Sequence, residues 1–257
     1  MKFGVCGNPQ AAQVAARAGF DYFEWSVAGL LKPREEESAF QAALDEVRQA
    51  NLSCPAVNVF IPADLKITGP NANLALLESF VTIACQRAQR AGVETIVFGS
   101  GGARRIPDGF DRGEAWRQVV AFCRMLAPIA ARNGVTIAVE PLNQAECNIL
   151  TSVSECGQLV REIQHPAIRL LVDAYHFLKD NDSLSDVAAN GDLLAHVHIA
   201  TTDNRLAPGM EACDLQPFFT ALLSSGYSGR VSIEGKLPDR VEDLQHSLGV
   251  IKRLIKA

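Results

Sequence analysis

Short runs of apolar residues alternate along the whole chain with longer stretches in which apolar residues recur at helical spacing. A short apolar run bounded by turn residues is typical of a buried strand, and the 3.6-residue spacing is typical of an amphipathic helix. The pattern predicts strands at Lys2–Cys6, Tyr22–Ser26, Ser53–Phe60, Thr95–Gly99, Val135–Glu140, Ile168–Asp173, Ala195–Ala200 and Val231–Glu234. It predicts helices between them, including Ala39–Ala50, Leu74–Ala91, Glu114–Asn133, Val153–Ile163, Leu215–Ser225 and Val241–Ile255.

Residues at the ends of the helical stretches support this division. Asn8 followed by Pro9 offers an N-cap and a proline at the first helical position. Ser152 and Glu155 have the spacing of a capping box. Glycines that lie just past predicted helix ends favour helix termination there, and these are Gly92, Gly134 and Gly226.

Eight strands, each followed by a helix, in a chain of 257 residues predict an α/β fold with a single (β/α)8 TIM barrel. A doubly wound open sheet is the rival, and it usually has a glycine-rich phosphate turn after the first strand. This chain has VCGNPQAA there, which is not G-x-G-x-x-G. No composition shift or linker divides the sequence, so we predict one TIM-barrel domain over residues 1–257.

The composition excludes several classes of partner. The content of 48% hydrophobic and 21% charged residues is ordinary for a soluble globular enzyme, and the net charge of −5 argues against nucleic acid. No segment reaches membrane-spanning length. The seven cysteines form no C-x-x-C pair, which favours free thiols in a reducing compartment. We expect a cytoplasmic enzyme with a small-molecule substrate, no nucleic-acid or membrane partner, and a possible homo-oligomeric state.

Four consecutive predicted strands carry ionisable residues at their carboxyl ends: Glu140, Asp173, His198 and Glu234. A buried carboxylate is unfavourable unless a metal, a cation or hydrogen bonds compensate it. In a TIM barrel the carboxyl ends of the strands form one mouth, where active sites lie. We therefore expect the four side chains to meet. Any one acid alone is better explained as a strand-end residue that hydrogen-bonds to a loop.

Three carboxylates and one imidazole form a mostly oxygen ligand set. Such a set suits Mn²⁺, Mg²⁺ or Co²⁺ better than a thiolate-binding metal. A cation there can polarise a substrate carbonyl as a Lewis acid and orient a neighbouring hydroxyl. The adjacent C–H then becomes more acidic, and a carboxylate that faces this carbon can act as a base. The pattern indicates proton transfer next to a carbonyl group.

The segments that carry these residues resemble a known family. VEPLNQAE, VDAYHFLKD, HVHIATTDNRLAPG and VSIEGK are similar to the xylose isomerase-like TIM barrel superfamily. Within it the chain most resembles the sugar phosphate isomerase/epimerase group, which contains ketose 3-epimerases and hydroxypyruvate isomerases. The resemblance extends to GFDYFEWSV and FGSGGARRIPDGF. It implies one divalent cation at Glu140, Asp173, His198 and Glu234, with Mn²⁺ preferred and Mg²⁺, Co²⁺ or Zn²⁺ as alternatives.

The same resemblance implies roles for individual side chains. Glu140 and Glu234 would be the catalytic pair that moves a proton on either face of the substrate. His176 and Glu146 would hold the terminal oxygens of the substrate, and Arg205 would bind another oxygen.

The chain also departs from the epimerases. It has LNQAE where they usually have LNRFE, so Gln144 and Ala145 change the wall beside Glu146. One extra residue precedes Arg205, and Gly235 stands where the epimerases tend to have proline. These differences favour a relative with a different substrate over a standard ketose 3-epimerase.

Other polar residues near the predicted mouth have structural alternatives. We interpret His196 as a hydrogen-bonded core residue, because it lies two positions before His198 and one layer deeper in the barrel. Glu24 either reaches the mouth or forms a structural salt bridge. The loop GSGGARRIPDGF either forms an anion-binding nest with Arg104 or Arg105, or is a flexible lid with solvated arginines.

The leading hypothesis is a divalent-metal-dependent isomerase or epimerase that acts on a small keto-sugar or hydroxycarbonyl substrate by proton transfer through an enediolate. A metal-dependent lyase or dehydratase on a keto-sugar or keto-polyol is the alternative within the same chemistry. An apurinic endonuclease-like phosphodiesterase shares the barrel, but its three metals need further histidines at other strand ends. The strand ends VNVF and VFGSGG have none. A non-catalytic barrel is expected to lack at least one of the four predicted metal ligands, and all four are present.

Overall fold

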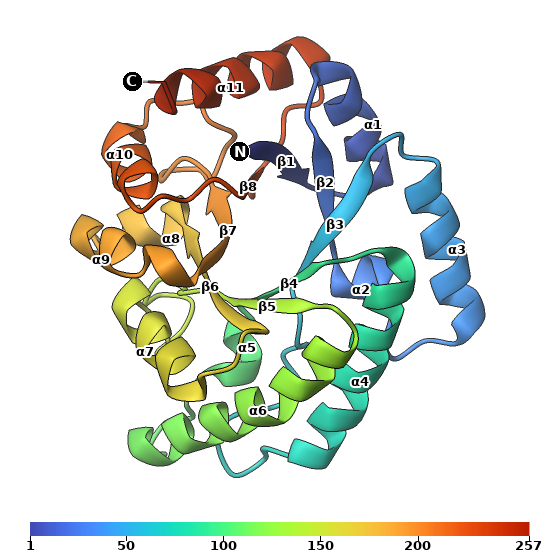
Figure 1. Cartoon of the computed structure of the whole chain (residues 1–257), viewed down its shortest axis with the longest axis vertical. Coiled ribbons are helices and arrows are strands. Elements are labelled where there is room, and N and C mark those ends of the chain that lie inside the picture. Colours follow the sequence, from blue (N-terminus) through green and yellow to red (C-terminus); the bar gives the residue numbers. More distant parts are fainter. Residues whose placement is uncertain (257) are drawn as a thin grey trace.

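The computed structural model describes residues 1–256 and forms a closed barrel of eight parallel strands (Figure 1). Each strand pairs with the next in sequence, and β8 pairs with β1 to close the barrel. The strands are β1 (Lys2–Cys6), β2 (Tyr22–Ser26), β3 (Ser53–Asn58), β4 (Thr95–Phe98), β5 (Thr136–Val139), β6 (Ile168–Asp173), β7 (Leu194–Ile199) and β8 (Arg230–Ile233). The predicted (β/α)8 barrel is confirmed.

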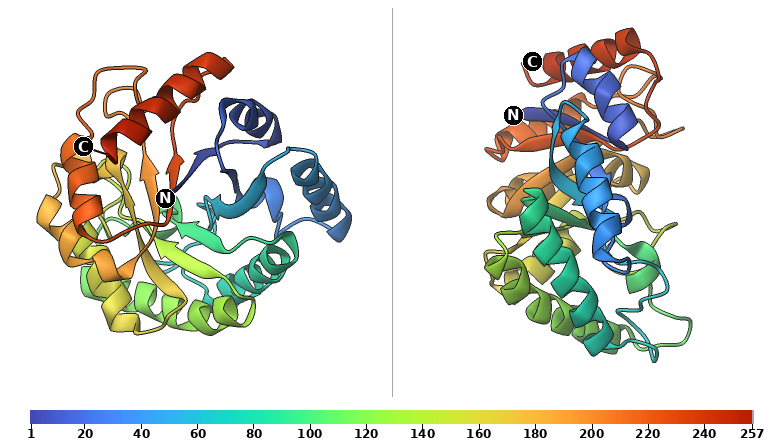
Figure 2. Two further views of the ribbon diagram at one scale, coloured as in Figure 1. Left: turned by 45° about the horizontal axis from the view of Figure 1, so that its top comes forward. Right: turned by 90° about the vertical axis from the view of Figure 1, so that its right-hand side faces the viewer.

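Helices surround the barrel on its outside (Figure 2). They are α1 (Pro9–Ala18), α2 (Val27–Leu30), α3 (Glu37–Arg48), α4 (Leu74–Ala91), α5 (Gly101–Arg104), α6 (Arg112–Arg132), α7 (Val153–Ile163), α8 (Ala174–Lys179), α9 (Leu184–Ala189), the 3₁₀ helix η1 (Gly191–Leu193), α10 (Gln216–Ser224) and α11 (Val241–Leu254). Within residues 1–256 there is no helix with the length and apolarity needed to cross a membrane.

The predicted helix caps form the expected hydrogen bonds. The side chain of Asn8 accepts from the backbone N–H of Ala11 (2.9 Å) at the start of α1. Ser152 Oγ accepts from the N–H of Glu155 (3.1 Å) at the start of α7. A side-chain acceptor satisfies a backbone donor that has no partner inside the helix. These local bonds explain why the sequence pattern places several helices accurately.

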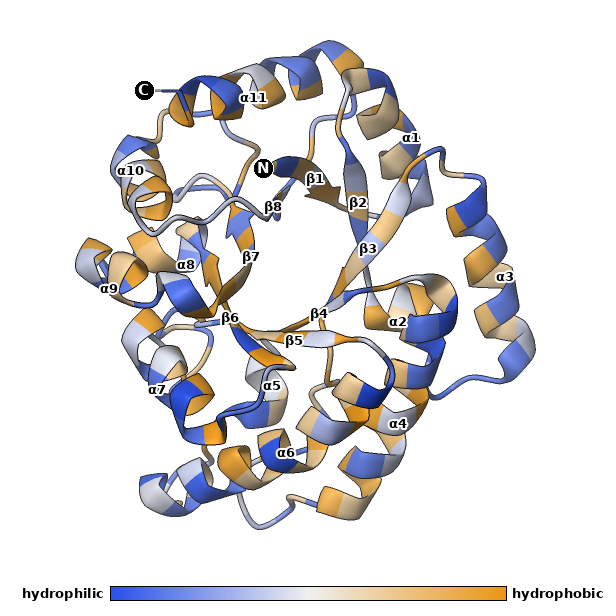
Figure 3. Cartoon of the chain, in the orientation of Figure 1, coloured by the Kyte–Doolittle hydropathy of each residue, from blue (hydrophilic) through white to orange (hydrophobic). Residues whose placement is uncertain are grey.

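The strands are buried on both faces, which explains their nearly continuous apolar runs. Inside the barrel, Val97, Ala138 and Leu171 form a small apolar cluster. Outside the barrel, the strands pack against the apolar faces of the helices. Apolar and polar residues alternate along these helices (Figure 3). The rings of Phe98 and Phe122, for example, lie 5.4 Å apart between β4 and α6. The barrel therefore holds the strand ends on a packed scaffold.

The loop after β4 contains a fully buried arginine. Arg104 lies at the end of α5, where its Nη1 donates to the carbonyl oxygen of Phe98 (3.1 Å). Its Nη2 donates to the carbonyl oxygens of Glu140 (2.7 Å) and Leu150 (3.2 Å). Both expectations for this side chain are wrong, because Arg104 is neither solvated nor free to bind an anion. It ties the ends of β4 and β5 to the loop that precedes α7.

We predict that Arg104→Met lowers the free energy of unfolding by about 2 kcal/mol, because the buried carbonyl of Glu140 loses its donor. Arg105→Met is the matched control, since Arg105 is exposed and its replacement should change stability by less than about 0.5 kcal/mol. Denaturant unfolding measures both values. Equal stabilities of the two variants would contradict the structural role of Arg104.

Candidate metal centre

The carboxyl ends of β5 to β8 bring the four predicted ligands together. Glu140 follows β5, Asp173 ends β6, His198 is the next-to-last residue of β7 and Glu234 follows β8. Nδ1 of His198 lies 3.3 Å from a carboxylate oxygen of Glu140 and 3.5 Å from one of Glu234. Ligand-type atoms of Glu140, Asp173, Glu234 and His176 all lie within 4.8 Å of one another. Glu140, Asp173, His198 and Glu234 thus lie together at one mouth, but the tightest group of ligand-type atoms there includes His176 rather than His198. The binding of a cation by the four predicted ligands stays a prediction.

Two local features place the first two acids. A Cβ atom at Gly99, just after β4, would lie 2.2 Å from Oε2 of Glu140, so only glycine leaves room for this carboxylate. Asp173 caps α8, because its Oδ1 accepts from the N–H of Tyr175 (2.9 Å). The other oxygen of Asp173, Oδ2, remains directed into the mouth. The backbone thus orients both carboxylates before any ligand is present.

His176 is buried beside the acids, and its hydrogen bonds define its chemical state. Its Nδ1 accepts from the backbone N–H of Asn143 (3.2 Å), which can only donate. Burial, assisted by the positive charge of Arg205, lowers the pKa of His176 to about 3, so the ring is neutral. The ring proton is therefore on Nε2, which lies 3.5 Å from Oδ2 of Asp173. In this state His176 is a hydrogen-bond donor and offers the mouth no lone pair for a metal.

Arg205 and Glu146 form the rim of the same group. Nη2 of Arg205 lies 2.5 Å from Oε2 of Glu234 and 3.4 Å from Oδ2 of Asp173. Its guanidinium carbon is 4.4 Å from the centre of the Tyr175 ring. Despite the extra residue before it, Arg205 reaches the site. The Glu146 side chain is 43% exposed, and its Oε1 is 4.0 Å from Nη1 of Arg205.

The electrostatics of the mouth is dominated by crowding of like charges. Burial, together with repulsion from Glu234 and Glu140, raises the pKa of Asp173 to about 8. Burial and the charge of Glu234 also raise the pKa of Glu140. Burial opposes ionisation of Glu234 as well, but His198 and Arg205 outweigh it and lower the pKa of Glu234. Three closely spaced carboxylates whose repulsion is only partly compensated fit a divalent cation, which would stabilise all three in the ionised form.

A second group of ligand-type side chains lies on the other side of His198. It contains Cys6 and Glu24, whose ligand atoms and those of His198 lie within 4.8 Å of one another. Nε2 of His198 is 3.0 Å from Oε1 of Glu24 and 4.0 Å from Sγ of Cys6. Because Nε2 already has a carboxylate acceptor, Nδ1 is the nitrogen available to the three acids of the first group.

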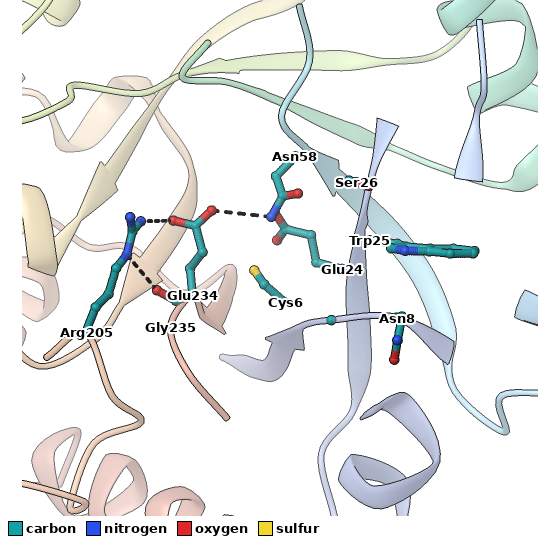
Figure 4. A pocket seen from close by; sticks show the side chains of 10 residues that line it. Cys6, Asn8, Glu24, Trp25, Ser26, Asn58, Arg205, Glu234 and Gly235 are labelled. Atoms are coloured by element: carbon teal, nitrogen blue, oxygen red, sulfur yellow. Dashed lines mark hydrogen bonds and ion pairs between the residues drawn. The ribbon is translucent and has the colours of Figure 1, made fainter. Parts of the chain in front are cut away.

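A cavity of about 400 Å³ adjoins Glu234 and Arg205 (Figure 4). Its wall includes Cys6, Asn8, Glu24, Trp25, Ser26 and Asn58. Nδ2 of Asn58 donates to Oε1 of Glu234 (3.4 Å), a contact that sequence reasoning missed. Asn58 is the last residue of β3, whereas the sequence pattern predicts a strand that continues past it to Phe60. A polar residue inside an apolar run was the signal, as it was for the acids.

The fold and the site define a class: TIM-barrel proteins with a carboxylate-rich site at the carboxyl ends of the strands. The sequence pattern of the xylose isomerase-like TIM barrel family matches residues 12–254. The chain therefore belongs to this family.

Individual relatives are sugar epimerases. The chain is 32% identical over 121 residues to the 3-dehydro-D-guloside 4-epimerase of Escherichia coli (strain K12), a match that spans 47% of this chain and 45% of that protein. It is 29% identical to the L-ribulose 3-epimerase of Methylomonas sp. (strain DH-1), over 90% of this chain and 79% of that protein.

Solved structures share the fold. A crystal structure of D-psicose 3-epimerase in the presence of D-fructose covers 100% of both chains with a TM-score of 0.85 and 17% identity. The crystal structure of the IolI protein with a binding zinc atom covers 100% of this chain and 98% of that chain, with a TM-score of 0.76 and 17% identity. At these identities the likeness supports the barrel alone.

We predict that the metal-free protein binds one Mn²⁺ ion per chain and releases protons as it does so. Asp173, whose pKa is raised to about 8, must ionise to bind the cation. His198, whose burial is outweighed by the charges of Glu24 and Glu234 so that its pKa is raised, must lose the proton on Nδ1. The affinity should therefore rise by at least about tenfold per pH unit until the pH reaches about 8. Calorimetry in buffers of different ionisation enthalpy counts the protons. Asp173→Asn should remove both binding and proton release. An affinity that does not change with pH would contradict this account of Asp173.

Proposed function

We propose that this protein is a divalent-metal-dependent isomerase or epimerase that acts on a small keto-sugar or hydroxycarbonyl substrate by proton transfer. One observation carries the proposal: at the barrel mouth, Nδ1 of His198 lies 3.3 Å from a carboxylate oxygen of Glu140 and 3.5 Å from one of Glu234. Membership of the xylose isomerase-like family supports it, as do two relatives that are sugar epimerases. The chain is an enzyme of this sugar isomerase and epimerase kind.

We assign the cation to Glu140, Asp173, His198 through Nδ1, and Glu234. When bound, the cation supplies Lewis-acid polarisation of a substrate carbonyl. Mn²⁺ is our preferred ion because three of the four donors are carboxylates, which suit hard cations. Zn²⁺ is the alternative, since it also accepts imidazole nitrogen and carboxylate oxygen as ligands.

The catalytic roles fall to Glu140 and Glu234. They come from β5 and β8, which are not neighbours in the barrel, so they approach the centre from different directions. Each carboxylate has two oxygens and needs only one as a ligand, which leaves the other to accept or donate a proton at a substrate carbon. Asn58 and Arg205 hold the two oxygens of Glu234 in a fixed orientation. Two bases at different positions permit inversion at one carbon.

Three further side chains can hold the substrate. The Nε2–H of His176 points toward Asp173 and can donate to a substrate oxygen at this position. Arg205 presents more donors beside it, and Glu146 offers an acceptor at the rim. A small molecule with several hydroxyl groups and a carbonyl satisfies this mixture of donors and acceptors.

The geometry disfavours an apurinic endonuclease. The three metals of that enzyme need histidines at the ends of additional strands. In this chain β3 ends in Asn58, and Gly99 follows β4. Neither residue supplies an imidazole, so a three-metal cluster has no ligands there.

We also propose that the enzyme works in the cytoplasm on a small molecule and without a nucleic-acid partner. All seven cysteines are free thiols, which suits a reducing compartment. The net charge of −5 is unfavourable for binding to phosphate backbones.

We predict that the Mn²⁺-loaded enzyme, incubated in D₂O with a panel of ketopentoses and ketohexoses, incorporates deuterium at the carbon next to the carbonyl of an accepted substrate. Glu140→Gln should reduce this exchange by roughly 10²- to 10⁴-fold, because the base at this position is lost. Glu78→Gln, on the exposed face of α4, is the control and should exchange normally. Mass spectrometry or NMR measures the exchange.

Two outcomes would change the assignment. Turnover without solvent deuterium in the product would indicate hydride transfer and contradict the proton-transfer mechanism. Deuterium exchange accompanied by loss of water would identify the lyase or dehydratase instead. Metal content must be measured in Glu140→Gln, since Glu140 is also a proposed ligand.

A further inference from the structure

A buried hydrogen-bond network lies inside the barrel next to the candidate metal centre. At its middle is Glu24 of β2, a carboxylate with no solvent exposure. It lies 2.8 Å from Nε2 of His196, 2.9 Å from Oγ of Ser232 and 3.0 Å from Nε2 of His198. The hydroxyl of Tyr22 lies 2.8 Å from Oγ of Ser232 and extends the network. The salt-bridge expectation for Glu24 is confirmed, and so is the hydrogen-bonded core position of His196.

The chemistry of these groups determines which atom donates and which accepts in each hydrogen bond of the network. An ionised carboxylate can only accept hydrogen bonds, whereas a hydroxyl and an imidazole N–H can donate. The hydroxyl of Ser232 donates to Oε2 of Glu24, so its oxygen is free to accept from Tyr22. The Nε2–H groups of His196 and His198 donate to the same carboxylate. Every bond therefore points toward Glu24, which is buried but has three donors around it.

The direction of the network determines which nitrogen of His198 faces the site. A neutral imidazole has one N–H donor and one lone pair. A metal-binding histidine must be neutral, and with Nε2–H donated to Glu24 it is Nδ1 that gives up its proton to a cation and then carries the lone pair. Nδ1 is the atom 3.3 Å from Glu140 and 3.5 Å from Glu234. A metal-binding histidine commonly donates its other N–H to a carboxylate, which fixes the ring orientation and strengthens the ligand.

We propose that Glu24 is a positioning residue for the metal centre. It holds the His198 ring in one orientation and one tautomer, so that the Nδ1 lone pair is directed at a cation bound by Glu140, Asp173 and Glu234. The inference rests on the proposed metal centre and assigns Glu24 no contact with substrate or cation.

His196 provides an internal comparison. Both histidines donate to Glu24, and their rings are 5.1 Å apart and nearly perpendicular. Nδ1 of His196 has no hydrogen-bond partner within the described part of the chain, and it lies deeper in the barrel. Only His198 combines a bond to Glu24 with a second nitrogen in the mouth. The positioning effect therefore concerns His198.

The competing interpretation is that Glu24 is itself a metal ligand, together with Cys6 and Nε2 of His198. That arrangement requires the lone pair of Nε2, so the hydrogen bond between Glu24 and His198 would have to break. The distance of 3.0 Å for that bond, against 4.0 Å from Nε2 to Sγ of Cys6, favours the positioning role. A cysteine variant separates the two interpretations.

The test is Mn²⁺ binding by calorimetry to the full chain and three variants. Glu24→Gln should weaken binding by about 10- to 100-fold, because the side chain keeps its shape but loses the charge that orients His198. Tyr22→Phe removes only the outer hydroxyl of the network, and Cys6→Ser changes the competing ligand group. Both should stay within about threefold of the unchanged protein, since the bond between Glu24 and His198 remains.

A spectroscopic signature separates positioning from general packing. The visible absorption bands of bound Co²⁺ depend on ligand geometry, so they should shift in Glu24→Gln and not in Tyr22→Phe. If Glu24→Gln does not fold, as judged by circular dichroism, Glu24→Asp keeps the charge but withdraws the carboxylate from His198. It should also weaken Mn²⁺ binding.

Several results would overturn the inference. Glu24→Gln, or Glu24→Asp in its place, could bind Mn²⁺ as tightly as the unchanged protein. Cys6→Ser could weaken binding as much as Glu24→Gln, which would place the cation on the other side of His198. Equal weakening in Tyr22→Phe would indicate a packing effect. If the unchanged chain binds no Mn²⁺, the proposed function fails together with the inference, whereas equal binding by Glu24→Gln rejects the inference alone.

Discussion

Repulsion among buried carboxylates is the constraint on which the rest of the structure depends. Ligand-type oxygens of Glu140, Asp173 and Glu234 lie within 4.8 Å of one another, Glu140 and Asp173 are buried, and the charges of the three acids disfavour each other's ionisation. Arg205 and His198 compensate part of this charge. A divalent cation would compensate the remainder, so the acids that repel one another are also those that make a strong ligand set.

The closed barrel makes this crowding possible. Residues far apart in the sequence meet because the carboxyl ends of parallel strands share one edge. Gly99 leaves space for the carboxylate of Glu140, and Arg104 donates a hydrogen bond to the carbonyl oxygen of the same residue. The backbone of Glu140 is thus held by the fold while its side chain faces the site. Such support keeps the carboxylate in place without relying on a ligand.

The sequence predicted the fold well where the signal was local. The bounds of β1, β2, β6, α4 and α7 agree with the prediction, because alternation, helical spacing and caps are all short-range. The short helices α2 and α5 span four residues each, too few for a periodic pattern. Arg104 was misplaced because its three carbonyl acceptors come from separate segments, and a charged side chain is rarely fully buried.

The candidate site could also be predicted from the sequence where the signal was local. The meeting of Glu140, Asp173, His198 and Glu234 could be predicted because each of these residues interrupts an apolar run at a strand end, and the family resemblance supplied His176 and Arg205. The contact between Glu24 and His198 joins residues 174 positions apart, so no local pattern reveals it. Asn58 was missed because the apolar run around it continued to Phe60.

Anomalous diffraction from a crystal soaked in Mn²⁺ tests the central claim most directly, because it locates the cation without reference to activity. The account predicts one anomalous peak per chain, bounded by Nδ1 of His198 and the carboxylates of Glu140, Asp173 and Glu234. A peak beside Sγ of Cys6 and Nε2 of His198, or no peak at the mouth, would contradict it.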